Sequence, residues 1–399
     1  MTRTEERLID ALGAVGRSVR QEALPPLPGH CPAAEPGRWG RWLAPLAAAA
    51  SVVLVVVLVG ALHLFSGRPP GGAAIGPPPR YYVSEEAMSI QVRDTATGAV
   101  TASLRRPFSG PRHFGMYANV VAAGGGGDRE FVAEYTGSRP HSTVTQTRLY
   151  SFHVTGAGRV AGLALVKGGR LGHFTGGTAL AVSPDGSQVA AVVYRTVGLQ
   201  GPRPLPQIMV VNLRTGAHSL WAGGLQRAGL YLSIPSISWG PGGRFLVFLG
   251  QWCHAWLLGE ICGTGPHFSQ VRTLRVGPGG GRLSDGSALL SQSARYAYLA
   301  QALLSPDGKA LTVVALGPAG LAPDRSIPQN FRVVRVPLRG AGAARVLYRG
   351  VLSNDPYVFL GSDASGRHLL LSGRLNGWID HGRLRLLASP VGGAFTDAW

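Results

Sequence analysis

The feature that most constrains the fold is a short turn sequence that recurs four times along the 399-residue chain. It reads Ala-Val-Ser-Pro-Asp-Gly at 181–186, Ser-Trp-Gly-Pro-Gly-Gly at 238–243, Leu-Ser-Pro-Asp-Gly at 304–308 and Gly-Ser-Asp-Ala-Ser-Gly at 361–366. An apolar run follows each copy, and the copies are spaced by roughly 60 residues, which indicates a repeat architecture. A degenerate fifth copy, AGGGGDREFVAEY, precedes them at about the same interval.

Each copy has the chemistry of a β-hairpin. Proline presets the backbone angle, an aspartate such as Asp185 or Asp307 bonds to its own backbone, and glycine takes the positive φ. The glycines in that last position are Gly186, Gly243, Gly308 and Gly366. The runs 207–223, 331–350 and 148–166 each add a third strand, a polar turn and a fourth strand. Four antiparallel strands per repeat make a propeller blade.

These hairpins resemble the blades of TolB-like and WD-repeat-type β-propellers over roughly residues 113–390. The resemblance implies an all-β propeller of about six four-stranded blades in residues 81–399. Residues 81–107 supply about three strands, which we interpret as an incomplete first blade that the C-terminus closes; five or seven blades remain alternatives. The tryptophan of the family pattern is present only as Trp239, and the Trp-Asp dipeptide of WD repeats is missing.

A second constraint is the apolar run 43–65, whose 23 residues include no Asp, Glu, Lys or Arg. A helix of that length spans a bilayer core of about 30 Å. Arg38 and Arg41 before the run favour a cytoplasmic N-terminus. The length of the run and the 42 residues before it favour an uncleaved anchor over a signal peptide. We therefore predict a single-pass protein of the cell membrane, with 66–80 a Pro/Gly linker and 81–399 outside the cytoplasm.

The N-terminal piece, 1–42, is predicted to be an amphipathic helix followed by a Pro/Gly tether. Leu8, Leu12, Val15 and Val19 recur on one helical face, and Pro25 and Pro26 end the helix. Such a helix is marginal alone, so this face should dock on the inner membrane surface or on a cytosolic protein. The layout resembles actinobacterial single-pass proteins that accompany extracytoplasmic-function sigma factors, although His30 and Cys31 alone do not make the zinc module of anti-sigma domains.

The charge of the chain is strongly positive, with a formal net charge of +18. Only Lys167 and Lys309 are lysines, and the arginine, glycine and proline content resembles that of proteins from high-GC actinomycetes. The arginine-rich codon usage of such organisms would explain the positive charge. The alternative explanation is a functional one, the attraction of the domain to anionic lipid headgroups or wall polymers. The basic residues are scattered and the domain is predicted to lie outside the cell, so we do not expect nucleic acid as a partner.

Three cysteines occur, and two of them, Cys253 and Cys262, flank an insertion in the longest repeat interval. Outside the cytoplasm we expect a disulfide between them, worth about 2–3 kcal/mol, with Cys31 on the reducing side. A metal site from Cys253, His254, Cys262 and His267 is the alternative, although this spacing matches no standard zinc pattern.

Catalytic signals are weak, since the sequence has no serine nucleophile elbow and no His-Glu-x-x-His motif. The Gly-Ala-Gly-Arg-Val-Ala run from Gly156 lies between two strands and reads as a hairpin turn instead of a dinucleotide-binding loop. We expect no cofactor, no metal and no catalytic residue. The preferred function is a binding or sensing propeller for an envelope ligand or protein, with a relay to a cytosolic partner. A propeller lyase or hydrolase, an anti-sigma-like regulator and an envelope scaffold are the alternatives.

Overall fold

The computed structural model describes the chain from residue 77 to residue 398 with gaps. The described ranges are 77–86, 89–105, 114–123, 129–138, 145–172, 174–195, 205–225, 230–253, 268–292, 298–317, 329–338, 342–352, 358–363, 365–373, 376–380, 382–387 and 397–398. The predicted N-terminal helix with Leu8, Leu12, Val15 and Val19, the predicted membrane span 43–65, and Cys31 and Cys262 lie outside these ranges. Within them, no helix is both long and apolar enough to cross a bilayer.

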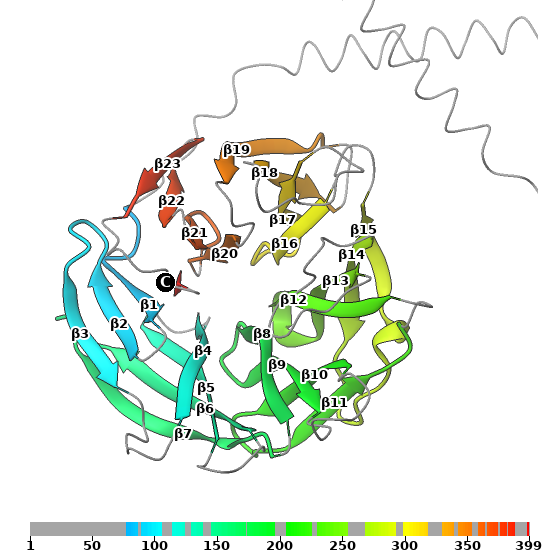
Figure 1. Cartoon of the computed structure of the whole chain (residues 1–399), viewed down its shortest axis with the longest axis horizontal. Coiled ribbons are helices and arrows are strands. Elements are labelled where there is room, and N and C mark those ends of the chain that lie inside the picture. Colours follow the sequence, from blue (N-terminus) through cyan, green and yellow to red (C-terminus); the bar gives the residue numbers. More distant parts are fainter. Residues whose placement is uncertain are drawn as a thin grey trace, which may run out of the picture. The chain divides into compact units, whose positions relative to one another are not determined.

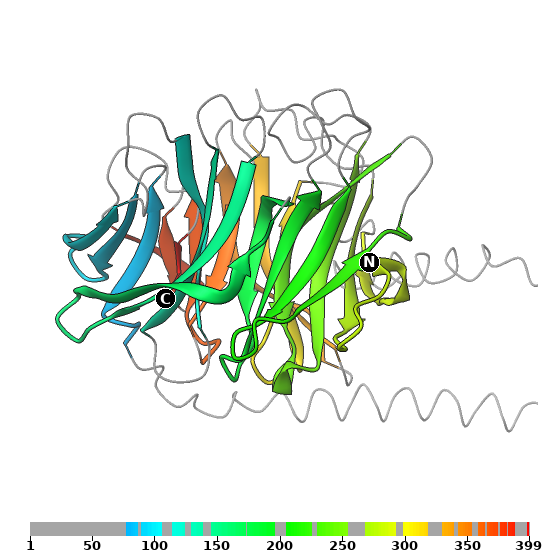
Figure 2. The same ribbon diagram turned by 90° about the horizontal axis from the view of Figure 1, so that it is seen from below.

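The residues from Ile75 to Trp399 belong to one compact unit, in which the described strands form six four-stranded antiparallel sheets. Figure 1 shows the sheets arranged as blades around a common centre, and Figure 2 shows the same ring from the side. This is a six-bladed β-propeller, as the repeat predicted.

The first three blades, numbered along the chain, have these strands in order from the centre outward. Blade 1 contains β24 (Asp397–Ala398), β1 (Tyr81–Glu86), β2 (Ser89–Asp94) and β3 (Val100–Arg105). Blade 2 contains β4 (Phe114–Ala122), β5 (Glu130–Ser138), β6 (Thr145–Val154) and β7 (Val160–Arg170). Blade 3 contains β8 (Phe174–Val182), β9 (Gln188–Arg195), β10 (Pro206–Asn212) and β11 (His218–Ala222).

The other three blades follow the same order. Blade 4 contains β12 (Tyr231–Trp239), β13 (Phe245–Cys253), β14 (Phe268–Arg275) and β15 (Ser287–Ser291), with the 3-10 turns η1 (Pro241–Gly243) and η2 (Leu283–Asp285). Blade 5 contains β16 (Tyr298–Leu304), β17 (Ala310–Leu316), β18 (Gln329–Pro337) and β19 (Arg345–Leu352). Blade 6 contains β20 (Val358–Ser362), β21 (Leu369–Gly373), β22 (Gly377–Asp380) and β23 (Arg383–Leu386).

The ring closes through blade 1, whose strands come from both ends of the propeller sequence. β24 pairs with β1 in antiparallel register, with Val83 opposite Ala398 and Ser84 opposite Asp397. Ala398 is buried in a cluster with Tyr81, Val83 and Tyr117. The prediction that the C-terminus completes an unfinished first blade is therefore confirmed.

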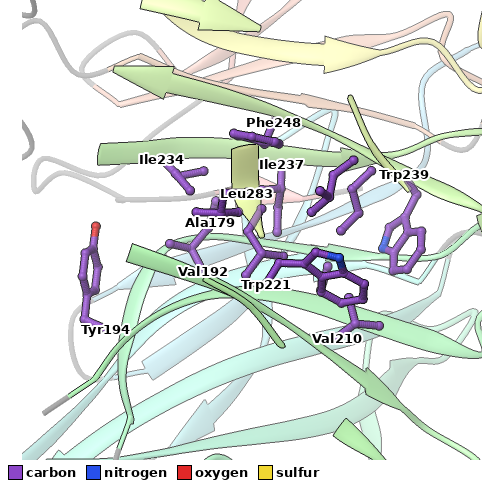
Figure 3. Packing of buried hydrophobic residues seen from close by; sticks show 14 residues of the cluster. Ala179, Val192, Tyr194, Val210, Trp221, Ile234, Ile237, Trp239, Phe248 and Leu283 are labelled. Carbon is purple, nitrogen blue, oxygen red and sulfur yellow. The ribbon is translucent and has the colours of Figure 1, made fainter. Parts of the chain in front are cut away.

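Apolar clusters between adjacent blades form the core. The cluster between blades 3 and 4, shown in Figure 3, sets Val192 and Trp221 of blade 3 against Ile234, Trp239 and Phe248 of blade 4. The strands alternate faces, so one strand supplies side chains to the clusters on both sides of its blade. Trp239 also donates a hydrogen bond from Nε1 to the carbonyl oxygen of Ala181 at 3.1 Å. The tryptophan of the repeat therefore joins neighbouring blades.

The innermost strands of four consecutive blades contain an irregularity that the sequence pattern did not predict. The register shifts lie between Tyr117 and Asn119 in β4, Gly176 and Leu180 in β8, Ser233 and Ser236 in β12, and Leu299 and Gln301 in β16. Bulges bend a strand and increase its twist, which suits strands that line the narrow centre of a ring.

Candidate functional site

The predicted turn residues lie between the first and second strands of blades 3 to 6. In blade 3, Asp185 accepts hydrogen bonds at Oδ1 from the Ser183 hydroxyl at 2.6 Å and from the Ser187 backbone N–H at 3.1 Å. The amide of Gly186 donates to the carbonyl oxygen of Ser183 at 2.9 Å, and Gly186 has φ of 68°. The Ser183 hydroxyl in turn accepts from the Gln188 amide at 2.9 Å. The serine and the aspartate together therefore satisfy the backbone of the hairpin.

Blade 5 repeats this network almost atom for atom. Asp307 accepts from the Ser305 hydroxyl at 2.6 Å and from the Lys309 amide at 3.0 Å. The Ala310 amide donates to the Ser305 hydroxyl at 3.0 Å. Gly308, at φ of 68°, closes the turn onto the Ser305 carbonyl oxygen. The predicted hairpin role of Asp307 and Gly308 thus matches their geometry.

Blade 6 exchanges the two polar positions. Asp363 occupies the place of the leading serine, and its Oδ2 accepts from the Ser365 hydroxyl at 2.7 Å. Asp363 also accepts from the amides of Arg367 and His368, and its Oδ2 lies 2.8 Å from Nδ1 of the buried His368. Gly366 keeps the positive φ, at 66°. The aspartate again holds the turn, here together with a histidine that sequence reasoning did not single out.

The turns also contact one another across the blade boundaries. A Cβ atom on Gly308 would lie 2.7 Å from Cγ of Pro241 in blade 4, and a Cβ on Gly366 would lie 2.4 Å from Cδ of Pro306 in blade 5. Gly243, in blade 4, faces Ser183 and Asp185 of blade 3 at ordinary contact distance. The turn residues predicted separately therefore form one row, in which Gly243, Gly308 and Gly366 each face the turn of the preceding blade.

Two carboxyl groups in this row, those of Asp185 and Asp307, are stabilised as anions. Hydrogen bonds from Ser183 and Ser187 lower the pKa of Asp185 below its usual value. The Ser305 hydroxyl and the Lys309 amide do the same for the pKa of Asp307. A carboxylate that is stabilised as the anion and whose oxygens already accept from its own turn is poorly suited to proton transfer.

A different carboxyl group, Glu134 on β5, is fully buried. Asn119 Nδ2 on β4 donates to its Oε2 at 3.0 Å, while Oε1 has no hydrogen-bond partner among the described residues. Strand alternation places Glu134 on the same face as Val132, which packs with Leu180 of blade 3. Burial raises the pKa of Glu134 to about 8, and the hydrogen bonds from Asn119 and Thr136 offset part of that rise. The group therefore holds a proton at neutral pH, between two blades.

Cys253, at the end of β13, is buried and disulfide-bonded. Its Sγ lies 3.7 Å from the carbonyl oxygen of Tyr231, and the neighbouring Trp252 donates from Nε1 to the carbonyl oxygen of Leu225 at 2.7 Å. Cys262, His254 and His267 lie outside the described residues, so the pairing with Cys262 stays a prediction. In the part of the chain that the structure describes, no three His, Cys, Asp or Glu side chains converge as metal ligands would.

Glu134 and the Asp363–His368 pair were not predicted, although the sequence contains a signal for each of them. Glu134 gives one signal, an acidic residue in the middle of the apolar run FVAEY, which is typical of a buried acid. The blade 6 turn gives another, because Asp-Ala-Ser-Gly aligned on Ser-Pro-Asp-Gly shows the exchange of serine and aspartate directly.

Comparison with protein-family models and with curated proteins finds no match for the sequence. Solved structures do match. An oligogalacturonate lyase in complex with manganese is 12% identical over 70% of this chain and 63% of its own, with a TM-score of 0.37. The acylaminoacyl peptidase of Pyrococcus horikoshii is 11% identical over 68% of this chain and 39% of its own, with a TM-score of 0.35. The tricorn protease is 9% identical over 75% of this chain and 34% of its own, with a TM-score of 0.34.

The chain thus spans less than two thirds of these three proteins, and about a third to two fifths of the two peptidases. The strand order and the closure by β24 establish the propeller fold of this chain independently of them.

Proposed function

We propose that the chain is a single-pass membrane protein whose propeller lies outside the cytoplasm and acts as a non-catalytic binding or sensing module. The observation that carries the proposal is that four carboxyl groups of the described residues have a structural role. Asp185, Asp307 and Asp363 hold their own turns, and Glu134 is enclosed between blades. These four acids serve the scaffold, and the net charge of +18 leaves an excess of positive charge, mostly from arginine, for a ligand.

The arrangement of the chain ends supports an anchored domain. β1 begins at Tyr81, directly after the predicted linker 66–80, and the C-terminal strand β24 pairs with β1. The propeller is therefore a closed domain that a single tether can hold, and the apolar run 43–65 is the natural anchor.

The location is tested with two reporters fused after Trp399 in the native host. Alkaline phosphatase, which folds only outside the cytoplasm, should be active, and a fluorescent protein that requires the cytoplasm should be dark. The reverse pattern, or loss of the N-terminus from the mature protein, would contradict the anchored topology.

We further propose that the predicted N-terminal helix captures a cytosolic protein, which makes the propeller a sensor. Its charges are of mixed sign, which suits a protein surface better than anionic lipid. Leu12→Asp with Val15→Asp should abolish capture and leave membrane insertion intact. If the wild-type helix and the double variant capture the same cytosolic proteins, the helix has no specific partner. The chain is then an anchored binding domain without a relay.

A further inference from the structure

The most uniformly charged described element of the propeller is the outer pair of strands in blade 5. Between Gln329 and Leu352 the sequence contains five arginines and no lysine, histidine or acidic residue. Four of the arginines lie on β18 and β19, which form the outer half of the blade. We call these two strands the arginine ribbon.

The four arginines form two cross-strand pairs. Arg332 lies directly opposite Arg349, and Arg335 lies directly opposite Arg345. Like charges at directly opposed positions of an antiparallel pair are destabilising. Among the described residues, no hydrogen bond or ion pair to any of the four side chains is present. Asp307 gives Arg335 a weak electrostatic neighbour, since Arg335 contributes to the lowered pKa of Asp307.

The two pairs point to opposite faces of the ribbon. Val333 packs in the cluster between blades 5 and 6, and Val334 packs in the cluster between blades 4 and 5. Alternation from these two residues places the Arg332–Arg349 pair on the blade 4 side and the Arg335–Arg345 pair on the blade 6 side. The register shifts between Val333 and Val334, where β19 has the extra residue Leu347, and this shift brings Arg345 opposite Arg335.

The flanks of the first pair are exposed and apolar. Arg349 is exposed and Arg332 is half-buried. On the same strand as Arg349, Val346 is 36% exposed and Val351 is 55% exposed. β19 is also the last strand of its sheet, so one side of its backbone faces away from the blade. This surface combines paired guanidinium groups with exposed aliphatic side chains.

We propose that the arginine ribbon is the docking surface of the propeller for a linear polyanion with repeated phosphate groups. This inference rests on the proposed binding function and assigns it a place and a ligand class. Directly opposed residues have Cα atoms about 4.5–5.5 Å apart, so two guanidinium groups can reach one oxyanion. An internal phosphate of such a chain has two non-bridging oxygens that share a negative charge, and each of them can accept a hydrogen bond from a different guanidinium group.

The placement of the pairs favours a flexible chain over a membrane surface. The pairs are three residues apart, or about 10 Å along the strand, which exceeds the size of one phosphate. Because they lie on opposite faces, a planar bilayer reaches one pair at a time. A flexible polymer that crosses the β19 edge reaches both, and its aliphatic links can contact Val346 and Val351.

The test measures binding of the full-length protein, held in nanodiscs of zwitterionic lipid, to linear inorganic polyphosphate at about 0.1 M salt. The test variant is Arg332→Thr with Arg349→Thr. The matched control is Arg159→Thr with Arg214→Thr, which removes the same charge from exposed turns of blades 2 and 3. We expect the test variant to bind at least about tenfold more weakly and the control to bind within about threefold of wild type.

A third variant separates binding from folding. Arg349→Glu places a carboxylate opposite Arg332, so the melting temperature should stay the same or rise while polyphosphate binding is lost. A folded Arg349→Glu protein that binds as well as wild type overturns the proposal. The proposal is also overturned if the control variant loses as much polyphosphate affinity as the test variant. That result would mean that the overall positive charge of the protein, and not the arginine ribbon, binds the polymer.

Two further probes identify the partner class. If the test variant loses binding to phosphatidylglycerol vesicles but binds polyphosphate as well as wild type does, the surface is assigned to a membrane. If wild type binds polyglutamate more tightly than polyphosphate, the surface is assigned to an acidic protein. Either result overturns the polymer assignment, as does the absence of any polyphosphate binding by wild type. The reporter fusions decide the anchored topology separately, so failure of either proposal can be recognised by itself.

Discussion

At the scale of single residues, Glu134 gives the propeller a dependence on pH. Its pKa is about 8 in the folded protein, against an ordinary value of 4.5. Between these values the folded state binds more protons than the unfolded state, so the free energy of unfolding falls as pH rises from about 5 to about 8. The full difference is on the order of 5 kcal/mol, with most of it lost by pH 8.

Glu134→Gln should remove this dependence because the amide has the same shape and does not titrate. We expect chemical unfolding midpoints of wild type at pH 5, 6.5 and 8 to decline, and those of the variant to vary much less. Glu130→Gln, an exposed position on the same strand, is the control and should follow wild type. A wild-type midpoint that does not change over this range would show that Glu134 is ionised in the fold.

A second prediction at the residue scale concerns the contact between the turns of neighbouring blades. Gly308→Ala introduces a Cβ at a φ of 68° and 2.7 Å from Pro241. Gly172→Ala introduces one at a φ of 66°, where no atom lies within 4 Å. Both changes incur the left-handed penalty of about 1–2 kcal/mol, and only the first disturbs a neighbouring blade. The free energy of unfolding should therefore fall by at least about 1 kcal/mol more for Gly308→Ala. Equal losses would mean that the contact between turns is not stabilising.

At the scale of elements, the two residues of β24 complete blade 1. Removing residues 397–399 takes away the partner of Val83 and Ser84 and uncovers the cluster that contains Ala398. We expect the melting temperature to fall by several degrees and the amides of β1 to exchange faster with solvent. A chain that lacks only Trp399 retains β24 and serves as the control. Equal melting temperatures for the two truncated chains would show that closure contributes little.

Much of the element scale was predictable from the sequence, and the reasons are local. Ser-Pro-Asp-Gly specifies a turn within four residues, so the hairpins at Gly186 and Gly308 follow from the letters alone. The unfinished three-strand start at Tyr81 required a fourth strand, and only the C-terminus was left to supply it. Closure therefore follows from counting strands, whereas the number of blades stayed open between five and seven until the structure showed six.

The features that escaped prediction depend on neighbours distant in sequence. The bulges in β4, β8, β12 and β16 arise where inner strands bend around the centre, and no single residue type encodes them. The burial of Glu134 depends on blade 3, and the opposition of Arg332 and Arg349 depends on the register of β18 with β19. A sequence shows that these residues are present, but only the assembled ring shows what each one faces.

At the scale of the whole molecule, the three cysteines report on topology. We expect one of them, Cys31, to react with a thiol reagent in denaturant without reductant, and all three to react after reduction. In intact cells an impermeant reagent should reach Cys31 only after the membrane is permeabilised. Reaction of all three cysteines before reduction would contradict the predicted Cys253–Cys262 disulfide. Labelling of Cys31 in intact cells would contradict the predicted cytoplasmic N-terminus.

The closure of the ring also determines how the domain responds to mechanical load. Five blades are each built from one continuous stretch of chain, and blade 1 alone joins two distant stretches. The predicted linker leads directly into β1, the strand that β24 secures through two residue pairs. Tension applied to the chain before β1 therefore loads the seam that β24 closes among the described strands, and the ring would open there before any other blade is disturbed.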